Sequence, residues 1–395
     1  MLRRVARYDR LNPARFVSFL SSTICIIATF HKLRDYSGPT GQRVAIEMSI
    51  TTAKFNAYVL PGHVSDARAG LDQARTGEAL GLGGIFLSER WDTKELGAVM
   101  GALTQVTDRV KLVAGLTHFG TRHPLVLAGM GATLQTLSGG RFVLGFGRSV
   151  PPLLGKLGIK AFDNAGMADF VALLRRLWAG ETINYSGPAG NFPEMQLTQR
   201  CLEPPPVILG AVGPNTLALA GAHFDGVVLH PFLTTEGVER SVAIVRGAAR
   251  ESGRDPNSIT VYATVVTVPD TLPSGQREDI LEARAVSYFM HRELGLMLAD
   301  INNWDRDPVD RVVEKGLNRL EFGRSDIATA RRQMGEAAAL LPPHWLMDGA
   351  AVGSVGHCLR RLDDYFSAGA DEILLHGTTC DQQAPLLEAL HGTQL

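Results

Sequence analysis

Short apolar segments alternate with longer segments of helical periodicity along most of this 395-residue chain. The apolar segments are rich in Val, Ile, Leu and Phe, which is typical of strands that are buried on both faces. Between them, apolar or small residues recur every three or four positions, as on one face of a helix. Eight strand segments are predicted in this way: Phe55–Leu60, Gly84–Trp91, Val110–Gly120, Arg141–Ser149, Pro205–Gly213, Asp225–Phe232, Ile259–Pro269 and Glu372–Gly377.

The predicted helices follow the strands in turn. They cover Ala67–Leu80, Lys94–Val106, Leu125–Leu137, Asp169–Leu177, Asn215–Ala222, Val238–Glu251, Val355–Phe366 and Pro385–Leu390. Eight strand-then-helix units favour a closed (β/α)8 TIM barrel over an open sheet, because closure removes the exposed edge strands. The stretch 270–346 is too long for an ordinary connection after the seventh strand. We therefore expect an insertion that forms a lid over one end of the barrel.

The first 47 residues differ from the rest of the chain. They contain eight Lys or Arg and only three Asp or Glu, around the interrupted apolar run Phe16–Phe30. That run is too short and too polar to favour a membrane span or an export signal. We predict that residues 1–47 are disordered or an over-extended start, with translation beginning at Met48, and that residues 48–395 form a single barrel domain.

Composition narrows the function further. With 39 basic and 40 acidic residues the net charge is −1, so no overall field attracts nucleic acid or an anionic membrane. The four cysteines lie far apart without metal-ligand spacing, which indicates reduced thiols in a cytoplasmic protein and no metal site. A small-molecule substrate is the expected partner.

In a barrel of this kind, chemistry takes place at the carboxyl ends of the strands. The segment ILGAVGPNT lets the backbone approach a ligand closely, and Pro214 suits the first turn of a helix whose free N–H groups hold an anion. LGFGRS adds the fixed positive charge of Arg148. The alternative is that both segments are glycine-rich turns with no ligand. LGFGRS lacks the third glycine of a dinucleotide-binding fingerprint, so NAD is disfavoured.

The order of the strand ends carries a family resemblance. SERW, AGLTHFGTRHP, LGFGRS, LGAVGPNTLALAG and DGVVLHP follow one another as in the luciferase-like flavin-dependent oxidoreductase superfamily. LGFGRS, GAVGPNT and the lid sequence INNWD resemble the branch that uses the deazaflavin coenzyme F420. The resemblance extends over nearly everything from Met48 onward. It implies a homodimeric, F420-dependent oxidoreductase that transfers a hydride between the deazaflavin and a small organic substrate.

The same resemblance implies where the coenzyme binds. A non-proline cis peptide at Gly115-Leu116, or one bond earlier, would support the back of the ring. Contacts to the coenzyme would come from three strand ends, at Gly115, Leu116, Thr117, Gly147, Arg148, Ser149, Ala211, Val212, Gly213, Pro214 and Asn215. A related sugar-phosphate dehydrogenase has an acid where this chain has Val150, so oxidation of sugar phosphates is in doubt.

Hydride transfer needs a proton donor, and the sequence offers His118, His230 and Glu89, with His63 as a further candidate. Each histidine is equally compatible with a structural hydrogen-bonding role. The expected substrate-binding residues are Arg90, Trp91, Tyr288, Met297 and Trp304, although the last three also fit the inner face of ordinary helices. Two other functions stay open: an FMN-dependent monooxygenase, and a cofactor-binding protein without catalytic activity.

Overall fold

The computed structural model describes residues 36–37, 43–44, 50–62, 64–90, 93–149, 151–273, 275–317 and 327–393. Contacts divide the chain into two compact units, Met1–Glu47 and Met48–Leu395. In the first unit, the described residues are the antiparallel strands β1 (Tyr36–Ser37) and β2 (Arg43–Val44). The unit boundary falls where the charge pattern changes. We predicted that residues 1–47 are disordered or an over-extended start. Apart from β1 and β2, these residues lie outside the described ranges.

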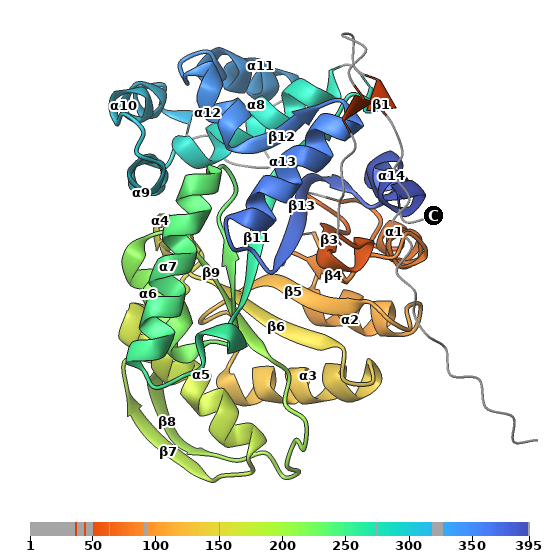
Figure 1. Cartoon of the computed structure of the whole chain (residues 1–395). Coiled ribbons are helices and arrows are strands. Elements are labelled where there is room, and N and C mark those ends of the chain that lie inside the picture. The colour runs from red at the N-terminus through yellow and green to blue at the C-terminus, as the bar shows by residue number, and fades with distance from the viewer. Residues whose placement is uncertain are drawn as a thin grey trace, which may run out of the picture. The chain divides into compact units, whose positions relative to one another are not determined.

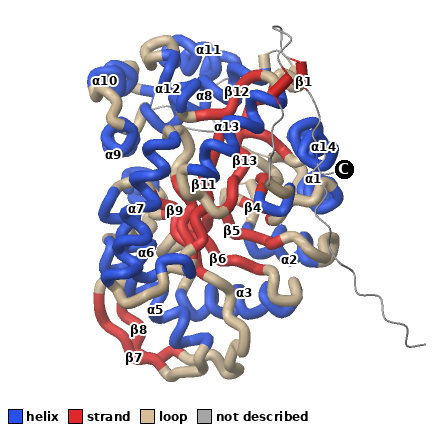
Figure 2. The backbone as a smooth tube through the Cα atoms, viewed as in Figure 1, coloured by secondary structure: helices blue, strands red, loops and turns tan. Residues whose placement is uncertain are grey.

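The second unit is a closed barrel of parallel strands, as predicted. Going round the barrel, the strands follow the order β10, β9, β6, β5, β4, β3, β13, β11, and β11 pairs with β10 to close the ring. Figure 2 shows these strands gathered inside a surround of helices. The barrel strands are β3 (Phe55–Tyr58), β4 (Gly84–Leu87), β5 (Lys111–His118), β6 (Phe142–Gly147), β9 (Val207–Ala211), β10 (Gly226–Leu229), β11 (Thr260–Pro269) and β13 (Glu372–Thr379).

The apolar strand segments reflect burial on both faces. Every residue of β4, β6 and β10 is buried. Alternate side chains fill the barrel interior in one cluster that includes Phe86, Tyr262 and Leu374, while the others pack against the surrounding helices. Two apolar faces on each strand are what a barrel with an outer helical layer requires.

The surrounding helices begin at the residue types that favour a helix start. Asp163, Thr234 and Ser354 each accept a hydrogen bond from a backbone N–H of the first turn, at α5, α7 and α13. Such a cap stabilises a helix by about 1 kcal/mol. The helices are α1 (Ala69–Ala79), α2 (Leu96–Thr104), α3 (Pro124–Leu137), α4 (Pro151–Lys156), α5 (Asn164–Trp178), α6 (Pro214–His223), α7 (Thr235–Glu251), α13 (Val355–Ser367) and α14 (Ala384–Thr393).

Two additions were not predicted. The antiparallel hairpin of β7 (Ile183–Gly187) and β8 (Gly190–Met195) lies between α5 and β9. Its strands are largely exposed and polar, so they lack the apolar alternation that marks a strand in sequence. The short strand β12 (Ala350–Gly353) pairs with the last residues of β11.

Among the described residues, the stretch predicted as a lid forms five helices, the last of which ends just beyond it. Figure 1 shows them grouped together: α8 (Gln276–Phe289), α9 (Arg292–Asn302), α10 (Asp307–Glu314), α11 (Ile327–Ala338) and α12 (Pro343–Asp348). Trp304 stacks on Trp345, with ring centroids 4.6 Å apart, and Phe289 packs against both. Asn302 attaches this helical group to the barrel, because its side chain accepts from the Thr234 amide N–H at 2.9 Å and donates to the Phe232 carbonyl at 2.8 Å. None of the helices within the described ranges has the length and apolarity needed to cross a membrane.

Candidate active site at the carboxyl ends of the strands

Parallel strands bring their carboxyl ends to the same end of the barrel, so the predicted site residues lie around one mouth. At the end of β5 the peptide bond between Gly115 and Leu116 is cis, as the family resemblance implied. The Leu116 side chain faces β6 and β9. A Cβ added to Gly145 or Gly210 would lie 2.8 Å or 2.4 Å from a Leu116 methyl carbon. These two glycines therefore make room for Leu116, which is a packing role rather than a ligand contact.

A buried ion pair joins β4 to the end of β5. The Glu89 carboxylate lies 2.5 Å from the Arg122 guanidinium and accepts a hydrogen bond of 2.5 Å from the Thr117 hydroxyl. Arg122 also donates to Thr117 at 3.2 Å and pairs with Glu95. Glu89 is 5% exposed. These contacts favour a role in which Glu89 positions Thr117. Arg122 belongs to the segment AGLTHFGTRHP, which carried part of the family resemblance, but the sequence analysis gave Arg122 itself no role.

The two predicted anion-binding segments come together in a pocket of about 350 Å³. We call this the anion pocket; its lining residues are Arg148, Asp163, Asn164, Gly213, Pro214, Asn215, Thr216 and Met297. Arg148 donates to the Asn164 side chain, and Asn164 donates to the Asn215 carbonyl at 3.2 Å. The pocket thus joins the end of β6 to the start of α6.

The anion pocket has the chemistry of an anion site. The Arg148 Nε is buried and has no hydrogen-bond partner among the described residues. In the first turn of α6, Pro214 has no N–H and the Thr216 N–H donates to the Gly213 carbonyl at 3.1 Å, which leaves the Asn215 N–H for a ligand. The helix dipole places partial positive charge at Gly213. The Asp163 carboxylate also lines the pocket, and it accepts a hydrogen bond of 2.7 Å from the Gly166 N–H. Arg148 and the positive end of α6 can together bind a phosphate, with Asp163 as one opposing negative charge in the lining.

The other predicted coenzyme contacts lead into this pocket or lie beside it. Ala211 ends β9 and Val212 follows it, and both are buried. Ser149 follows Arg148 with a positive φ of 62°. Gly147 ends β6, and its carbonyl contacts the His118 ring. The structure therefore brings the β6 and β9 residues to one place, while Leu116 and Thr117 lie on the adjacent strand.

Each predicted histidine directs a ring nitrogen at a backbone carbonyl. His118 Nδ1 lies 3.3 Å from the Gly147 oxygen, and His230 Nδ1 lies 2.9 Å from the Pro231 oxygen. Burial lowers the pKa of His118, and it lowers the pKa of His230 to about 4. Both rings are therefore neutral near pH 7, each with its Nδ1 proton held by a carbonyl. His63, like Trp91 and Val150, lies outside the described residues.

A second group of side chains meets on the opposite part of the mouth. The Tyr288 hydroxyl, from α8, lies 3.0 Å from His376 Nε2, at β13. The rings of Tyr58 and His376 are 5.4 Å apart, and those of His230 and Tyr288 are 4.5 Å apart. Burial lowers the pKa of His376 well below its ordinary value, with Arg284 and His230 adding to the effect. Sequence analysis placed Tyr288 at the pocket and His376 at a strand end, but could not pair them.

The remaining predicted substrate contacts are dispersed. Met297 lines the anion pocket, where its sulfur would lie 2.8 Å from a Cβ added to Gly213. Trp304 packs inside the helical group. The Arg90 side chain is exposed, and its carbonyl accepts from the N–H groups of Thr93 and Lys94. Burial, with Arg90 nearby, lowers the pKa of Lys94 to about 8.

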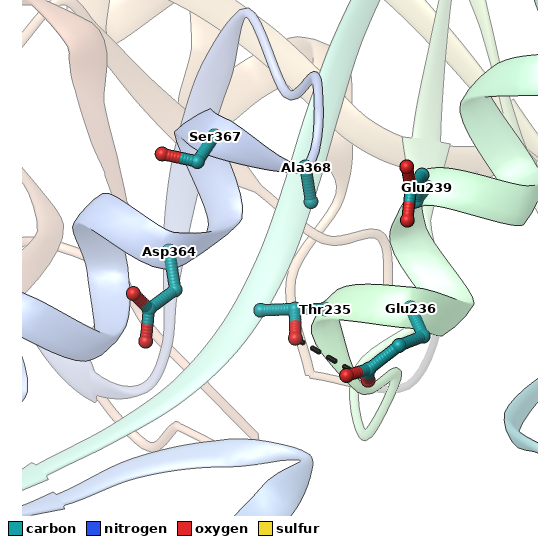
Figure 3. A pocket seen from close by; sticks show the side chains of 6 residues that line it. All are labelled: Thr235, Glu236, Glu239, Asp364, Ser367 and Ala368. Carbon is teal, nitrogen blue, oxygen red and sulfur yellow. Dashed lines mark hydrogen bonds between the residues drawn. The ribbon is translucent and has the colours of Figure 1, made fainter.

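A second pocket, of about 280 Å³, lies between α7 and α13 and contains none of the predicted residues. Figure 3 shows its lining, which includes the carboxylates of Glu236, Glu239 and Asp364. Three carboxylates repel an anionic ligand, so this pocket does not compete with the anion pocket for a phosphate.

Comparison with known proteins places this geometry in context. The sequence profile described as luciferase-like monooxygenase matches residues 47–372. A 5,10-methylenetetrahydromethanopterin reductase from Methanolobus tindarius is 27% identical over 194 residues, which are 48% of this chain and 58% of that protein. The match thus spans less than two thirds of that reductase. A Mycobacterium tuberculosis protein named provisionally as a coenzyme F420-dependent oxidoreductase is 26% identical over 333 residues, which are 77% of this chain and 89% of that protein.

Solved structures agree on the fold. The coenzyme F420-dependent tetrahydromethanopterin reductase from Methanopyrus kandleri superimposes with a TM-score of 0.70 at 18% identity, covering 85% of this chain and 96% of that one. An identity this low bears on the architecture alone.

Proposed function

This chain belongs to the luciferase-like monooxygenase family, and we propose that it is a coenzyme F420-dependent oxidoreductase acting on a small organic substrate. Two relatives matched in sequence act as reductases or carry the name of F420-dependent oxidoreductases. The proposal goes beyond family membership in naming the coenzyme and the type of reaction.

The observation that carries the proposal is the buried, unpartnered Nε of Arg148 beside the start of α6. A guanidinium N–H left without a partner costs about 1–3 kcal/mol, unless a ligand accepts from it. A phosphate on the tail of the coenzyme would accept from Arg148 and from the Asn215 N–H at the start of α6. Asn164 would hold Arg148 in place, because it already accepts from the guanidinium.

The bound deazaflavin would supply two electrons as hydride from a ring carbon, while the protein orients the ring and provides a proton. Leu116 packs against the cluster that fills the barrel interior, and Gly145 and Gly210 make room for its side chain. It would form the apolar surface behind the ring. The mouth on the far side, towards Tyr288 and His376, would receive the substrate. Arg90 remains our candidate for an anionic substrate group, and helices α8 to α12 our candidate for a lid.

Equilibrium dialysis of the purified protein against F420, and separately against FMN, tests the proposal. We expect F420 to bind and FMN to bind at least 10-fold more weakly. Tight binding of FMN without binding of F420 would favour the monooxygenase instead. Arg176→Met serves as a control variant, because Arg176 pairs with Glu181 on the surface, away from the anion pocket. Its affinities for F420 and for FMN should equal those of the wild type.

A further inference from the structure

Hydride transfer to a double bond must be completed by a proton, and three of the four donors predicted from sequence are poorly suited to give one. The fourth, His63, lies outside the described residues. Glu89 is held by Arg122 and Thr117. The neutral rings of His118 and His230 each keep their proton on Nδ1, directed at a carbonyl oxygen that can only accept. The donor is therefore to be sought elsewhere in the mouth.

The surroundings of His376 determine which of its nitrogens carries the proton. Nδ1 is buried and has no partner among the described residues, whereas Nε2 lies 3.0 Å from the Tyr288 hydroxyl. A buried N–H without an acceptor is rarer and more costly than a buried acceptor without a donor. The neutral ring thus carries its proton on Nε2 and donates it to the Tyr288 oxygen. The hydroxyl proton of Tyr288 is then not used by His376.

We propose that Tyr288 is the proton donor of this enzyme and that His376 is the residue that positions it. The inference rests on the proposed function. In the reductive direction, hydride from the reduced deazaflavin forms a bond to one atom of a C=C, C=N or C=O group, and the π electrons move to the other atom. That atom takes the Tyr288 hydroxyl proton, leaving a phenolate. Solvent returns a proton to Tyr288 afterwards.

A hydrogen-bond donor and two positive charges lie around Tyr288 and Tyr58 in the mouth. His376 Nε2–H donates to the oxygen that becomes negative. Arg284 precedes Tyr288 by four residues on α8, on the same helix face, and its charge acts on both His376 and Tyr58. His230, from β10, contributes a neutral ring edge. Arg90, from the end of β4, adds a second positive charge near Tyr58.

Tyr58 is the nearest alternative donor, and its environment differs. Its ring contacts the His376 ring edge-on, but the structure gives its hydroxyl no hydrogen bond to that histidine. Burial raises the pKa of Tyr58 far above its ordinary value, which disfavours its phenolate. Tyr58→Phe is therefore the matched control for Tyr288→Phe, since each change removes one hydroxyl near the same ring.

The first test measures the tautomer of His376 and needs neither coenzyme nor substrate. Protein labelled with ¹⁵N-histidine is studied by long-range ¹H–¹⁵N NMR near pH 7, with the His376 signals assigned by their loss in His376→Gln. We expect Nε2 to be protonated, Nδ1 to be bare, and the Nε2 signal to shift in Tyr288→Phe. A proton on Nδ1 would overturn the proposal.

The second test measures the proton-dependent step in enzyme loaded with reduced F420, using 2-cyclohexen-1-one as the acceptor in stopped flow. Tyr288→Phe should slow oxidation of the coenzyme by about 100-fold or more, with F420 affinity unchanged within about twofold. Tyr58→Phe should keep the rate within about threefold. His376→Gln should alter the pH profile of the rate while F420 still binds.

The outcomes separate the two proposals. Absence of F420 binding contradicts the proposed function. Binding of F420 together with an unslowed Tyr288→Phe, or with an equal loss in Tyr58→Phe, contradicts Tyr288 as the donor. Should the wild-type enzyme leave the enone unreduced, the tautomer of His376 decides the assignment.

Discussion

The anion pocket and the Tyr288–His376 pair occupy the same barrel mouth but are assembled from the chain in different ways. Arg148 and Asn164 are 16 residues apart, and Gly213, Pro214, Asn215 and Thr216 are consecutive. Tyr288 and His376 are 88 residues apart, on a helix of the long insertion and on the last barrel strand. The halves of the anion pocket also meet only after folding, because Asn164 and Asn215 are 51 residues apart, but each half is a recognisable local segment. The proton donor and the histidine that positions it are single residues that no local segment marks.

The largest expected effect tests the anion pocket. Gly213→Asp places a carboxylate where a phosphate would bind and a Cβ 2.8 Å from the Met297 sulfur. We expect F420 affinity to fall more than about 100-fold, measured by equilibrium dialysis, because the new charge repels the ligand at short range. Gly213→Ala separates the steric part from the charge.

Gly247→Asp is the matched control, since a Cβ at that glycine meets nothing within 4 Å. Its affinity for F420 should equal that of the wild type. An unchanged affinity in Gly213→Asp would remove the start of α6 from the coenzyme site.

A smaller effect is expected at Arg148. Arg148→Met removes a charged hydrogen-bond donor and keeps an apolar side chain of roughly similar length. Hydrogen bonds to charged groups contribute about 1.5–3 kcal/mol. F420 affinity should therefore fall about 10- to 100-fold. The NMR signals of His376 should stay where they are, because Arg148 lies on the other side of the mouth. A coupled shift of those signals would mean that the two regions are not independent.

The smallest effect concerns the buried histidines. The pKa of His230 is lowered to about 4 in the folded protein, while an unfolded histidine titrates near 6.5. Between these values the unfolded chain binds a proton that the folded one excludes, so the free energy of unfolding falls as pH decreases from about 6.5 to 4. Between pH 6.5 and 5 we expect His230 to contribute about 1–2 kcal/mol to this loss.

Urea unfolding at several pH values gives the free energy of unfolding as a function of pH. The contribution of His230 is the difference between the slopes of this plot for the wild type and for His230→Gln. His344→Gln is the control, because His344 is exposed on α12 and solvent surrounds its ring in both states. Equal slopes in the wild type and His230→Gln would show that His230 is not protected from protonation.

Much of the architecture could be predicted from sequence because its signals are local. Seven barrel strands fell within predicted segments, and β13 runs two residues past the predicted Glu372–Gly377. Burial on both faces produces a continuous apolar run, as in β6 and β10. The β7–β8 hairpin was not predicted, because its residues are mostly exposed and form no apolar run. The alternation of strands and helices predicted the closed barrel, and the structure confirms this prediction.

The site divides in the same way. Arg148 and Gly213 were found through local segments, and the cis bond at Gly115-Leu116 through family resemblance. The pairing of Arg122 with Glu89, the packing of Trp304 on Trp345, and the contact between Tyr288 and His376 depend on tertiary structure. No spacing in the sequence carries that information. The roles of individual site residues remain predictions.

Closure of the barrel also fixes the order in which the mouth is completed. The ring of strands is joined where β13 pairs with β3, through Ile373 opposite Phe55 and Leu375 opposite Ala57. His376 follows directly on this seam. A nascent chain on the ribosome therefore carries Arg148, Gly213 and Tyr288 long before it can close the ring. Truncation before residue 372 removes the histidine and the last barrel strand together.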